Sequence, residues 1–324
     1  MNKTSKKVCV VGAGNWGSNH IRVLNEMGSL GAIVDSNSST IKRFRQLYTD
    51  INFYRNVEDS FKGSFDGYVV ATPAVTHFQI AEILIKNKCH VLVEKPLALN
   101  VKGASKLNEL AQENEINLMV GHLLLFHPAI LKIKQMIADG AIGELQYLYS
   151  NRLNLGTIRS EENILWSFAP HDISIFQFLV KKFPIEVLSR GGCFVQTDLH
   201  DTTMTVLQYP ENIIGHIFVS WLHPFKEHRL VVIGSKGMIS FDDSSKDKKL
   251  NYHDKNINIS AGVPTKFEGE TLEVEYNREM PLDRELQYFV DHLDGSPIDN
   301  SDANSAIEVL KILDMATNSL TGKA

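Results

Sequence analysis

The amino-acid sequence predicts an α/β protein of two domains, spanning residues 1–122 and 123–324. Up to Gly121, short apolar strands alternate with helices, which is typical of a doubly wound parallel sheet covered on both faces. After Gly121 the segments lengthen and alternate between polar and apolar residues, which favours an α/β domain with a large, mostly antiparallel open sheet. A chain of 324 residues is long enough to give each domain a core of its own.

The first domain is predicted from continuous apolar runs of strand length. The expected strands are Val8–Val11, Gly31–Val34, Phe65–Ala71, His90–Val93 and Asn117–Val120. Apolar residues at helical spacing lie between them and predict the helices Ser18–Met27, Thr76–Asn87 and Val101–Asn114.

The second domain is predicted to open with a helix and to continue as a sheet. Its expected helices, including two near the end of the chain, are Pro128–Asp139, His171–Lys181, Asp283–Leu293 and Ala303–Leu320. Its expected strands are Leu145–Leu153, Glu186–Val195, Thr202–Tyr209, Ile213–Leu222 and His228–Ile233. The polar stretch Asp242–Asn258 is expected to form a surface loop or an edge hairpin.

A glycine-rich turn between the first strand and the first helix gives the strongest functional signal. Gly12 allows a tight turn, Gly14 lets the backbone approach a pyrophosphate, and Gly17 lets helix and strand pack closely. The helix N-terminus offers N–H groups to phosphates. Asp35, at the end of the second strand, can accept hydrogen bonds from both ribose hydroxyls of an adenosine. The sequence therefore predicts a dinucleotide-binding domain over residues 1–122.

The same segment predicts which dinucleotide is preferred. The Asp35 carboxylate would repel a 2′-phosphate, which favours NAD over NADP. Four residues that follow it weaken this choice, because they could hydrogen-bond or pair with such a phosphate. They are Ser36, Lys42, Arg43 and Arg45.

Three further segments follow strands of the same sheet, and ligands gather at the carboxyl ends of parallel strands. These segments are Ala71-Thr72-Pro73, Glu94-Lys95-Pro96 and Gly121-His122. We expect them to line one crevice together with the glycine-rich turn. Lys95 is held between a strand end and a proline, which restricts the residue before it.

The second domain contributes two groups of polar residues. Pro170 is expected in the first turn of a helix, so that His171 would lie near the helix start, where its ordinary pKa suits proton exchange at neutral pH. Strand alternation places Arg152 and Asn154 on one face, and a loop carries Arg159. Arginines bind carboxylate or phosphate groups, although they also occur on solvated sheet faces.

Bulk properties exclude several classes of protein. A net charge of −5 and a pI near 6.2 argue against a nucleic-acid partner. No apolar run reaches the length of a membrane span, and no signal peptide is recognised, so no membrane partner is expected. The three scattered cysteines fit a reduced cytoplasm, and the histidine and cysteine spacings predict no metal site.

These motifs, in this order, resemble the Gfo/Idh/MocA family of NAD(P)-dependent sugar and polyol dehydrogenases. The resemblance covers nearly the whole chain and rests on VVGAGNWG, ATPAVTH at 71–77, VLVEKPLAL at 91–99, VGHLLLFHPA at 120–129, APHDIS, and ELQYFVDHLDG at 285–295. It implies a Rossmann domain and a second domain whose sheet forms a homodimer or homotetramer. It assigns Lys95 and His171 as catalytic, and implies that both groups act on one alcohol beside the cofactor ring.

The resemblance also implies the wider site. The implied cofactor-binding residues are Gly12, Gly14, Asn15, Trp16, Gly17, Asp35, Ser36, Thr72, Pro73, His77, Glu94, Lys95 and His122. The implied substrate-binding residues are Lys95, Arg152, Asn154, Arg159, Trp166 and His171. One departure is clear. Many members carry an aspartate four residues before the catalytic histidine, where this chain has Ser167, so that His171 would rely on another acid such as Asp172 or Glu161.

The combination NLGxIR, LW and APHDI is similar to members that act on nucleotide-linked sugars in surface-polysaccharide assembly, such as UDP-N-acetylglucosamine-uronate 3-dehydrogenases. The expected reaction is oxidation of a secondary sugar hydroxyl. His171 would take the hydroxyl proton, and Lys95 would stabilise the developing negative charge. Two alternatives remain: an inositol or simple-sugar dehydrogenase, and a catalytically weak dinucleotide-binding sensor or partner protein, which Ser167 favours.

Overall fold

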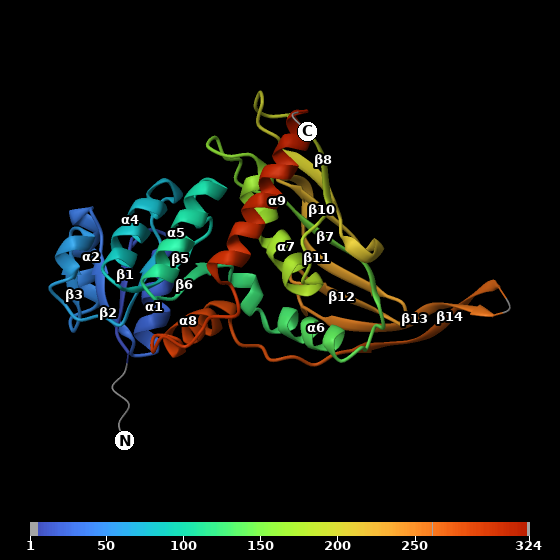
Figure 1. Ribbon diagram of the computed structural model, residues 1–324, viewed down its shortest axis with the longest axis horizontal. Coiled ribbons are helices and arrows are strands. Elements are labelled where there is room, and N and C mark those ends of the chain that lie inside the picture. The colour runs from blue at the N-terminus through green and yellow to red at the C-terminus, as the bar shows by residue number, and fades with distance from the viewer. Residues whose placement is uncertain (1–5, 261, 323–324) are drawn as a thin grey trace, which may run out of the picture. The chain divides into compact units, whose positions relative to one another are not determined.

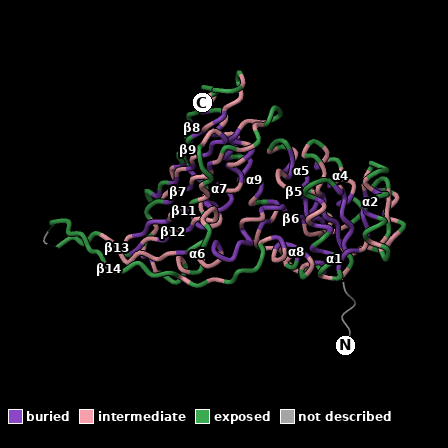
Figure 2. The backbone as a smooth tube through the Cα atoms, turned by 180° about the vertical axis from the view of Figure 1, so that it is seen from behind, coloured by how far each residue is buried: buried purple, intermediate pink, exposed green. Residues whose placement is uncertain are grey.

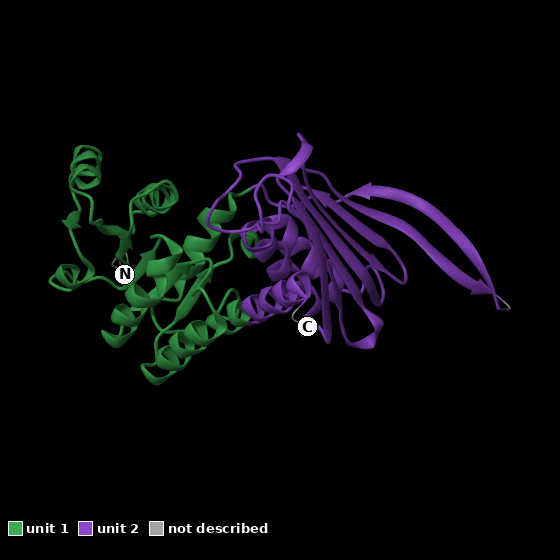
Figure 3. Ribbon diagram, turned by 90° about the horizontal axis from the view of Figure 1, so that it is seen from above, with its two compact units in different colours: residues 1–126, 279–307 green, residues 127–278, 308–324 purple. Residues whose placement is uncertain are grey.

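The computed structural model describes residues 6–260 and 262–322 (Figure 1). The chain divides into two compact units (Figure 3). Unit 1 comprises Met1–Phe126 and Glu279–Ile307, and unit 2 comprises His127–Arg278 and Glu308–Ala324. The expected division into residues 1–122 and 123–324 therefore differs at the C-terminal end, where one helix of the tail packs with the first sheet. The reason is that Leu286 and Phe289 of this helix are fully buried in unit 1.

Unit 1 alternates strands and helices as predicted. Its strands are β1 (Val8–Val11), β2 (Leu30–Val34), β3 (Asn52–Tyr54), β4 (Gly67–Val70), β5 (His90–Glu94) and β6 (Leu118–Gly121). Its helices are α1 (Gly17–Glu26), α2 (Ser38–Leu47), α3 (Val57–Ser60), α4 (Ala74–Lys86), α5 (Val101–Glu113), the 3₁₀ turn η1 (Leu123–Phe126) and α8 (Pro281–Asp291).

Within the described part of unit 1, six parallel strands form one sheet in the order β3-β2-β1-β4-β5-β6. The order reverses between β1 and β4, and the carboxyl ends of these two strands form the usual ligand crevice of such sheets. Val10, Val69 and Leu92 have no exposed surface, as expected for a sheet covered on both faces (Figure 2). The predicted doubly wound parallel sheet is thus confirmed.

Unit 2 is built on longer strands. They are β7 (Leu145–Leu155), β8 (Glu186–Gly192), β9 (Thr202–Gln208), β10 (Ile214–Ser220), β11 (Leu222–Gly234), β12 (Met238–Asp242), β13 (Leu250–Ser260) and β14 (Val263–Glu273). Its helices are α6 (Pro128–Ala138), α7 (Ile164–Val180) and the 3₁₀ turn η2 (Pro210–Asn212), together with the part of α9 (Ala303–Thr321) from Glu308 onward.

The described strands of unit 2 form one sheet in the order β14-β13-β12-β11-β7-β10-β9-β8, antiparallel except for the pair β7 and β10. This confirms the predicted large, mostly antiparallel sheet. The polar stretch 242–258 leads into an edge hairpin, because β13 and β14 pair as a ribbon that extends beyond their neighbours (Figure 1).

One boundary was predicted wrongly. The helix expected to begin near His171 begins at Ile164, so Pro170 lies inside α7 rather than in its first turn. Asn163 supplies the start signal, since its side chain accepts a hydrogen bond from the backbone N–H of Trp166 at 3.1 Å. Ile164 and Leu165 are fully buried and fix this first turn against the core. His171 is therefore in the middle of the helix.

Candidate functional site

The glycine-rich turn has the geometry that a dinucleotide needs. Gly12 has a φ of +94°, and a Cβ atom there would lie 2.7 Å from the carbonyl oxygen of Ala71. Gly14 differs, because a Cβ atom there would meet nothing within 4 Å. The turn is therefore closed towards the protein at Gly12 and open outward at Gly14. The start of α1 has no side-chain cap and no acidic residue in its first turn, which leaves its N–H groups suited to phosphate.

A cavity of about 780 Å³ lies against this turn. Of the predicted cofactor-binding residues, those that line it are Gly12, Gly14, Asn15, Trp16, Asp35, Ser36, Thr72 and Pro73. The Asp35 carboxylate is held by two backbone N–H groups, those of Ala13 at 2.9 Å and Asn37 at 2.8 Å. Each oxygen keeps a second lone pair for a ribose hydroxyl. The residues present thus fit the adenosine and pyrophosphate of a dinucleotide.

Sequence reasoning missed part of this lining. Arg55, Asn56 and Glu58 follow β3 and line the same cavity. The signal was weak, because β3 has only three residues and none of them is buried. The cations suggested from the sequence lie elsewhere: Arg43 covers the Phe44 ring at 4.8 Å, and Arg45 covers the Phe53 ring at 5.4 Å.

The remaining predicted cofactor-binding residues are not part of this lining. They are Gly17, His77, Glu94, Lys95 and His122. His77 is buried, and its two ring nitrogens lie 2.8 Å from the backbone oxygens of Thr72 and Pro96. It joins the loops that follow β4 and β5. In the loop that follows β5, the Lys95–Pro96 peptide bond is cis.

Glu94 forms the centre of a buried polar cluster under the Lys95 loop. Its carboxylate accepts a hydrogen bond from the backbone N–H of Lys95 at 3.2 Å, contacts His20 Nε2 at 2.8 Å and accepts another from the Trp16 ring N–H. Burial alone would raise the pKa of Glu94, but these contacts with His20, Trp16 and Lys95 outweigh it and hold the pKa below its ordinary value. The cluster therefore ties the start of α1 to the end of β5.

Two further buried groups belong to this cluster. Burial, together with the nearby charge of Lys95, lowers the pKa of His122 to about 4, so the imidazole is neutral at neutral pH. Glu285 of α8 is fully buried, and neither of its carboxyl oxygens has a hydrogen-bond partner among the described residues. Burial and the nearby charge of Glu94 raise the pKa of Glu285 well above its ordinary value. Sequence reasoning missed this acid, because it lies in an ordinary amphipathic helix pattern.

In unit 2, the strand that carries two predicted substrate residues faces α7. Arg152 donates to Asp172 with two nitrogens, at 2.8 and 3.1 Å, and both side chains are largely buried. Asp172 is therefore the ion-pair partner of Arg152. His228 lies opposite Arg152 in the sheet register, and burial together with the charge of Arg152 lowers its pKa to about 4.

The other predicted substrate residues of unit 2 are spread along β7, the following loop and α7. Asn154 lies on the strand face that carries Arg152, with its side chain over Gly156. Arg159 is exposed and pairs with Glu162 at 2.6 Å, and the ring N–H of Trp166 donates to Thr317 at 3.0 Å. His171 lies one helical turn after Ser167 on α7.

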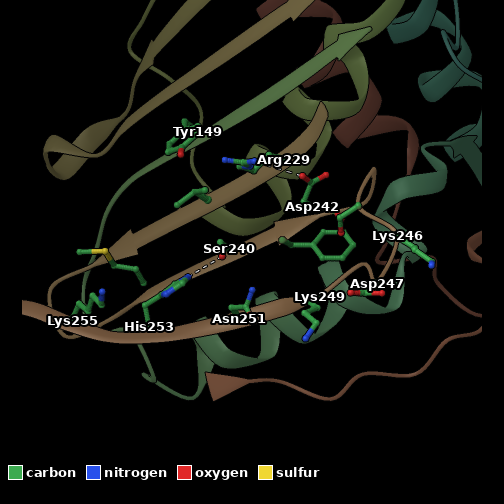
Figure 4. Close-up of a pocket in the computed structure, with 14 residues that line it drawn as sticks. Tyr149, Arg229, Ser240, Asp242, Lys246, Asp247, Lys249, Asn251, His253 and Lys255 are labelled. Carbon is green, nitrogen blue, oxygen red and sulfur yellow. Dashed lines mark hydrogen bonds and ion pairs between the residues drawn. The ribbon is translucent and has the colours of Figure 1, made fainter. Parts of the chain in front are cut away.

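A second hollow, of about 570 Å³, lies on the sheet face of unit 2 (Figure 4). The view shows Tyr149, Arg229 and Ser240 on the strands, while Lys246 and Lys255 lie at opposite ends of the hollow. Such diverging charges lack the converging polar groups of a small-molecule site. The described residues also hold no group of three potential metal ligands and no helix long and apolar enough to cross a membrane.

Comparison with known proteins matches both parts of the chain to one family. Residues 6–122 match the profile of the GFO/IDH/MocA oxidoreductase family with an NAD-binding Rossmann fold, and residues 130–240 match a C-terminal domain of the same family. The UDP-N-acetylglucosamine 3-dehydrogenase of Acidithiobacillus ferrooxidans is 27% identical over 202 residues, 61% of this chain and 62% of that protein. The myo-inositol 2-dehydrogenase of Thermotoga maritima is 24% identical over 251 residues, 73% and 75% of the two chains.

Solved structures show the same fold. The Acidithiobacillus ferrooxidans enzyme GnnA superposes with a TM-score of 0.85 at 21% identity, covering 98% of this chain and 97% of that one. The Bordetella pertussis dehydrogenase WlbA, solved with NADH and UDP-GlcNAcA, superposes with a TM-score of 0.78 at 18% identity, covering 99% and 98%. Both parts of the chain match profiles of one family, and the glycine-rich turn fits a dinucleotide. This chain therefore belongs to the GFO/IDH/MocA family of NAD-binding oxidoreductases.

Proposed function

We propose that this chain oxidises a secondary hydroxyl of a nucleotide-linked sugar in surface-polysaccharide biosynthesis. The observation that carries the proposal is the combined likeness to UDP-N-acetylglucosamine 3-dehydrogenase in sequence and in fold. WlbA, whose structure contains NADH and UDP-GlcNAcA, supports the same substrate class. We also propose a cytoplasmic location, because nucleotide sugars are made there. The same location fits the free thiols of Cys9, Cys89 and Cys193, none of which forms a disulfide bond within the described residues.

The proposed chemistry divides the work between two residues. The residues that line the cavity at Gly12, Gly14 and Asp35 would hold NAD, which would supply the acceptor for the hydride that leaves the carbinol carbon. The His171 imidazole takes the hydroxyl proton, and the Lys95 ammonium stabilises the negative charge that develops on the substrate oxygen. In unit 1, the Glu94 contact with the Lys95 backbone supports this assignment, because it fixes the start of the Lys95 loop.

The immediate surroundings of His171 bear on its strength as a base. Ser167 supplies no charge, and Asp172 is paired with Arg152. Glu161 is exposed and accepts a hydrogen bond from Ser160. We propose that Ser167, which stands where many members of the family carry an aspartate, makes His171 a weaker base. A Ser167→Asp variant should therefore turn over faster than the wild type.

A screen of substrates with NAD, read by nicotinamide absorbance, tests the function. We expect turnover with UDP-N-acetylglucosamine or its uronate. The likeness to myo-inositol 2-dehydrogenase favours a second candidate, and turnover with myo-inositol or free hexoses alone would select it. Tight NADH binding without turnover on any sugar would instead support the third alternative, a catalytically weak sensor or partner protein, which the serine at position 167 favours.

We also propose that the protein forms a homodimer or homotetramer through the sheet of unit 2. α7 covers one face of this sheet, as the Arg152–Asp172 pair shows. The opposite face exposes large apolar side chains, which are Tyr147, Leu188, Met204, Val206 and Ile214. Such a patch marks an interaction surface. A Met204→Asp variant should dissociate in light scattering after size exclusion, whereas an unchanged mass would contradict this interface.

A further inference from the structure

The outer part of the β13–β14 hairpin, called here the ribbon, consists of residues 255–260 and 263–268 at one edge of the unit 2 sheet. It extends beyond the neighbouring strands and is mostly exposed (Figure 2). Ile257, Ile259 and Val263 are each at least 60% exposed. An isolated two-stranded hairpin is at best marginally stable in water. The ribbon therefore needs a surface that covers its apolar side chains.

The isoleucines of the ribbon lie on the same face of the sheet as the hollow of unit 2. His253 and Lys255 of β13 line that hollow (Figure 4), and every second side chain of a strand shares a face. Ile257 and Ile259 continue this series beyond the hollow. The outer edge of β14 carries Pro264, which cannot donate to a further strand. A partner is therefore expected to cover the face of the ribbon rather than to pair with its edge.

The hollow beside the ribbon combines apolar side chains with an excess of positive charge. Tyr149, Val231 and Met238 line it from the neighbouring strands β7, β11 and β12. Its charged lining residues are Arg229, Lys246, Lys249, Lys255, Asp242 and Asp247. β14 has the opposite balance, with three acids and one cation. Lys249 and Glu273 pair within the chain at 2.7 Å, which leaves one excess cation at the hollow and one excess acid on β14.

We propose that two copies of this chain exchange their ribbons about a twofold axis, so that the ribbon of each copy lies in the hollow of the other. Because ribbon and hollow lie on one face of the sheet, two copies that meet through this face present each ribbon to the other copy's hollow. The isoleucines then cover the apolar lining, and the acids of β14 meet the cations around it.

The occupant is a second copy because one chain carries both complementary halves of the contact. The ribbon lies beyond residue 240, where the match to the C-terminal family profile ends. The proposal rests on the association through the unit 2 sheet proposed above, and it does not depend on the substrate.

Disulfide cross-linking of the full chain tests this contact. The background is Cys89→Ser with Cys193→Ser, which removes the two native thiols that are not buried. Ile259→Cys and Met238→Cys are then combined in one chain, which is oxidised with copper–phenanthroline. Met238 pairs with His253, six residues before Ile259, so the two positions lie about 20 Å apart within one chain, too far for a disulfide bond. We expect a dimer on a non-reducing gel, whereas each single-cysteine variant should run as a monomer.

Asn258→Cys combined with Met238→Cys is the matched control, because Asn258 precedes Ile259 on the opposite face of the ribbon and should give little cross-linked dimer. Light scattering after size exclusion gives a second readout. Ile259→Asp should raise the dissociation constant of the pair at least about 100-fold, since each copy loses one buried isoleucine. Asn258→Asp should keep the mass of the wild type.

Equal cross-linking by the Asn258→Cys control, or a mass that Ile259→Asp leaves unchanged, would overturn the exchange and leave the ribbon to another partner. An assembled wild type that gives no cross-link would also overturn it, while the association through the patch at Met204 would stand. A monomeric wild type would overturn the exchange and the sheet association together. Neither result bears on the proposed catalysis, which the substrate screen tests separately.

Discussion

Replacing Glu285 by glutamine tests the charge state of the buried cluster under the Lys95 loop. Glu285 is fully buried in unit 1 with no hydrogen-bond partner for either oxygen among the described residues, and Glu94 is its charged neighbour. An ionised carboxylate in this position would lose its hydration and meet the repulsion of a second carboxylate. The folded protein therefore holds Glu285 as the neutral acid, and glutamine reproduces its shape and its neutrality.

The sign and the slope follow from proton linkage. Folding raises the pKa of Glu285 from its ordinary value of 4.5, so the stability that the acid contributes is complete below that pH. It is lost as the pH rises, because the unfolded chain releases the proton and the folded chain does not. The free energy of unfolding of the wild type should fall by about 1.4 kcal/mol per pH unit relative to Glu285→Gln, until the pH reaches the folded-state pKa.

Urea denaturation followed by tryptophan fluorescence, repeated from pH 5 upward, measures this difference. We expect the two stability curves to diverge with rising pH, with the glutamine variant increasingly the more stable. Asp291→Asn is the matched control, because it removes an exposed acid from the same helix and leaves the buried cluster intact. Curves for wild type and Glu285→Gln that stay parallel would refute the reasoning, since the carboxyl would then titrate alike in the folded and unfolded chains.

Three further predictions address the site. Lys95→Ala should bind NADH as the wild type does and lose about 10²–10⁴-fold in turnover, so near-normal steady-state rates would exclude Lys95 from the mechanism. Gly14→Val should keep the wild-type melting temperature, because nothing lies within 4 Å of its Cβ position, yet lose at least about tenfold in NADH affinity by calorimetry. Arg152→Ala should destabilise the fold by about 3–5 kcal/mol in urea by leaving the buried charge of Asp172 unpaired, and a double variant with Asp172→Leu should recover much of that loss.

Much of the fold could be predicted because local patterns agree with it. The apolar runs of β1, β4 and β5 and the glycine-rich turn carry their structure in a few adjacent residues. Prediction failed where a local signal was weak or ambiguous. β3 is too short to show a period, and the proline at position 170 indicated a helix start that Asn163 provides about two turns earlier.

The candidate site could be predicted only where chemistry and local geometry coincide. Asp35 lies at a strand end after a glycine-rich turn, so its place in the adenosine cavity followed from sequence spacing. Arg55 enters the same cavity from a different strand end, and Glu285 reaches Glu94 from a helix near the other end of the chain. Contacts of this kind depend on tertiary packing, which leaves no periodic trace in the sequence.

The Glu94 cluster links the cofactor turn to the Lys95 loop, so cofactor binding and the proposed catalytic role of Lys95 need not be separable in unit 1. One carboxylate holds Trp16 and His20 of the segment that begins α1, and it also accepts the backbone N–H of Lys95. Trp16 lines the dinucleotide cavity, so a change in the charge of Glu94 would act on the cofactor turn and on the lysine loop together. The neutral form of Glu285 preserves this arrangement. A second ionised carboxylate beside Glu94 would repel the negative charge with which Glu94 binds both segments. A substitution at the Lys95 side chain leaves the hydrogen bond of the Lys95 backbone N–H to Glu94 in place, so it separates the role of the ammonium group from that of the loop.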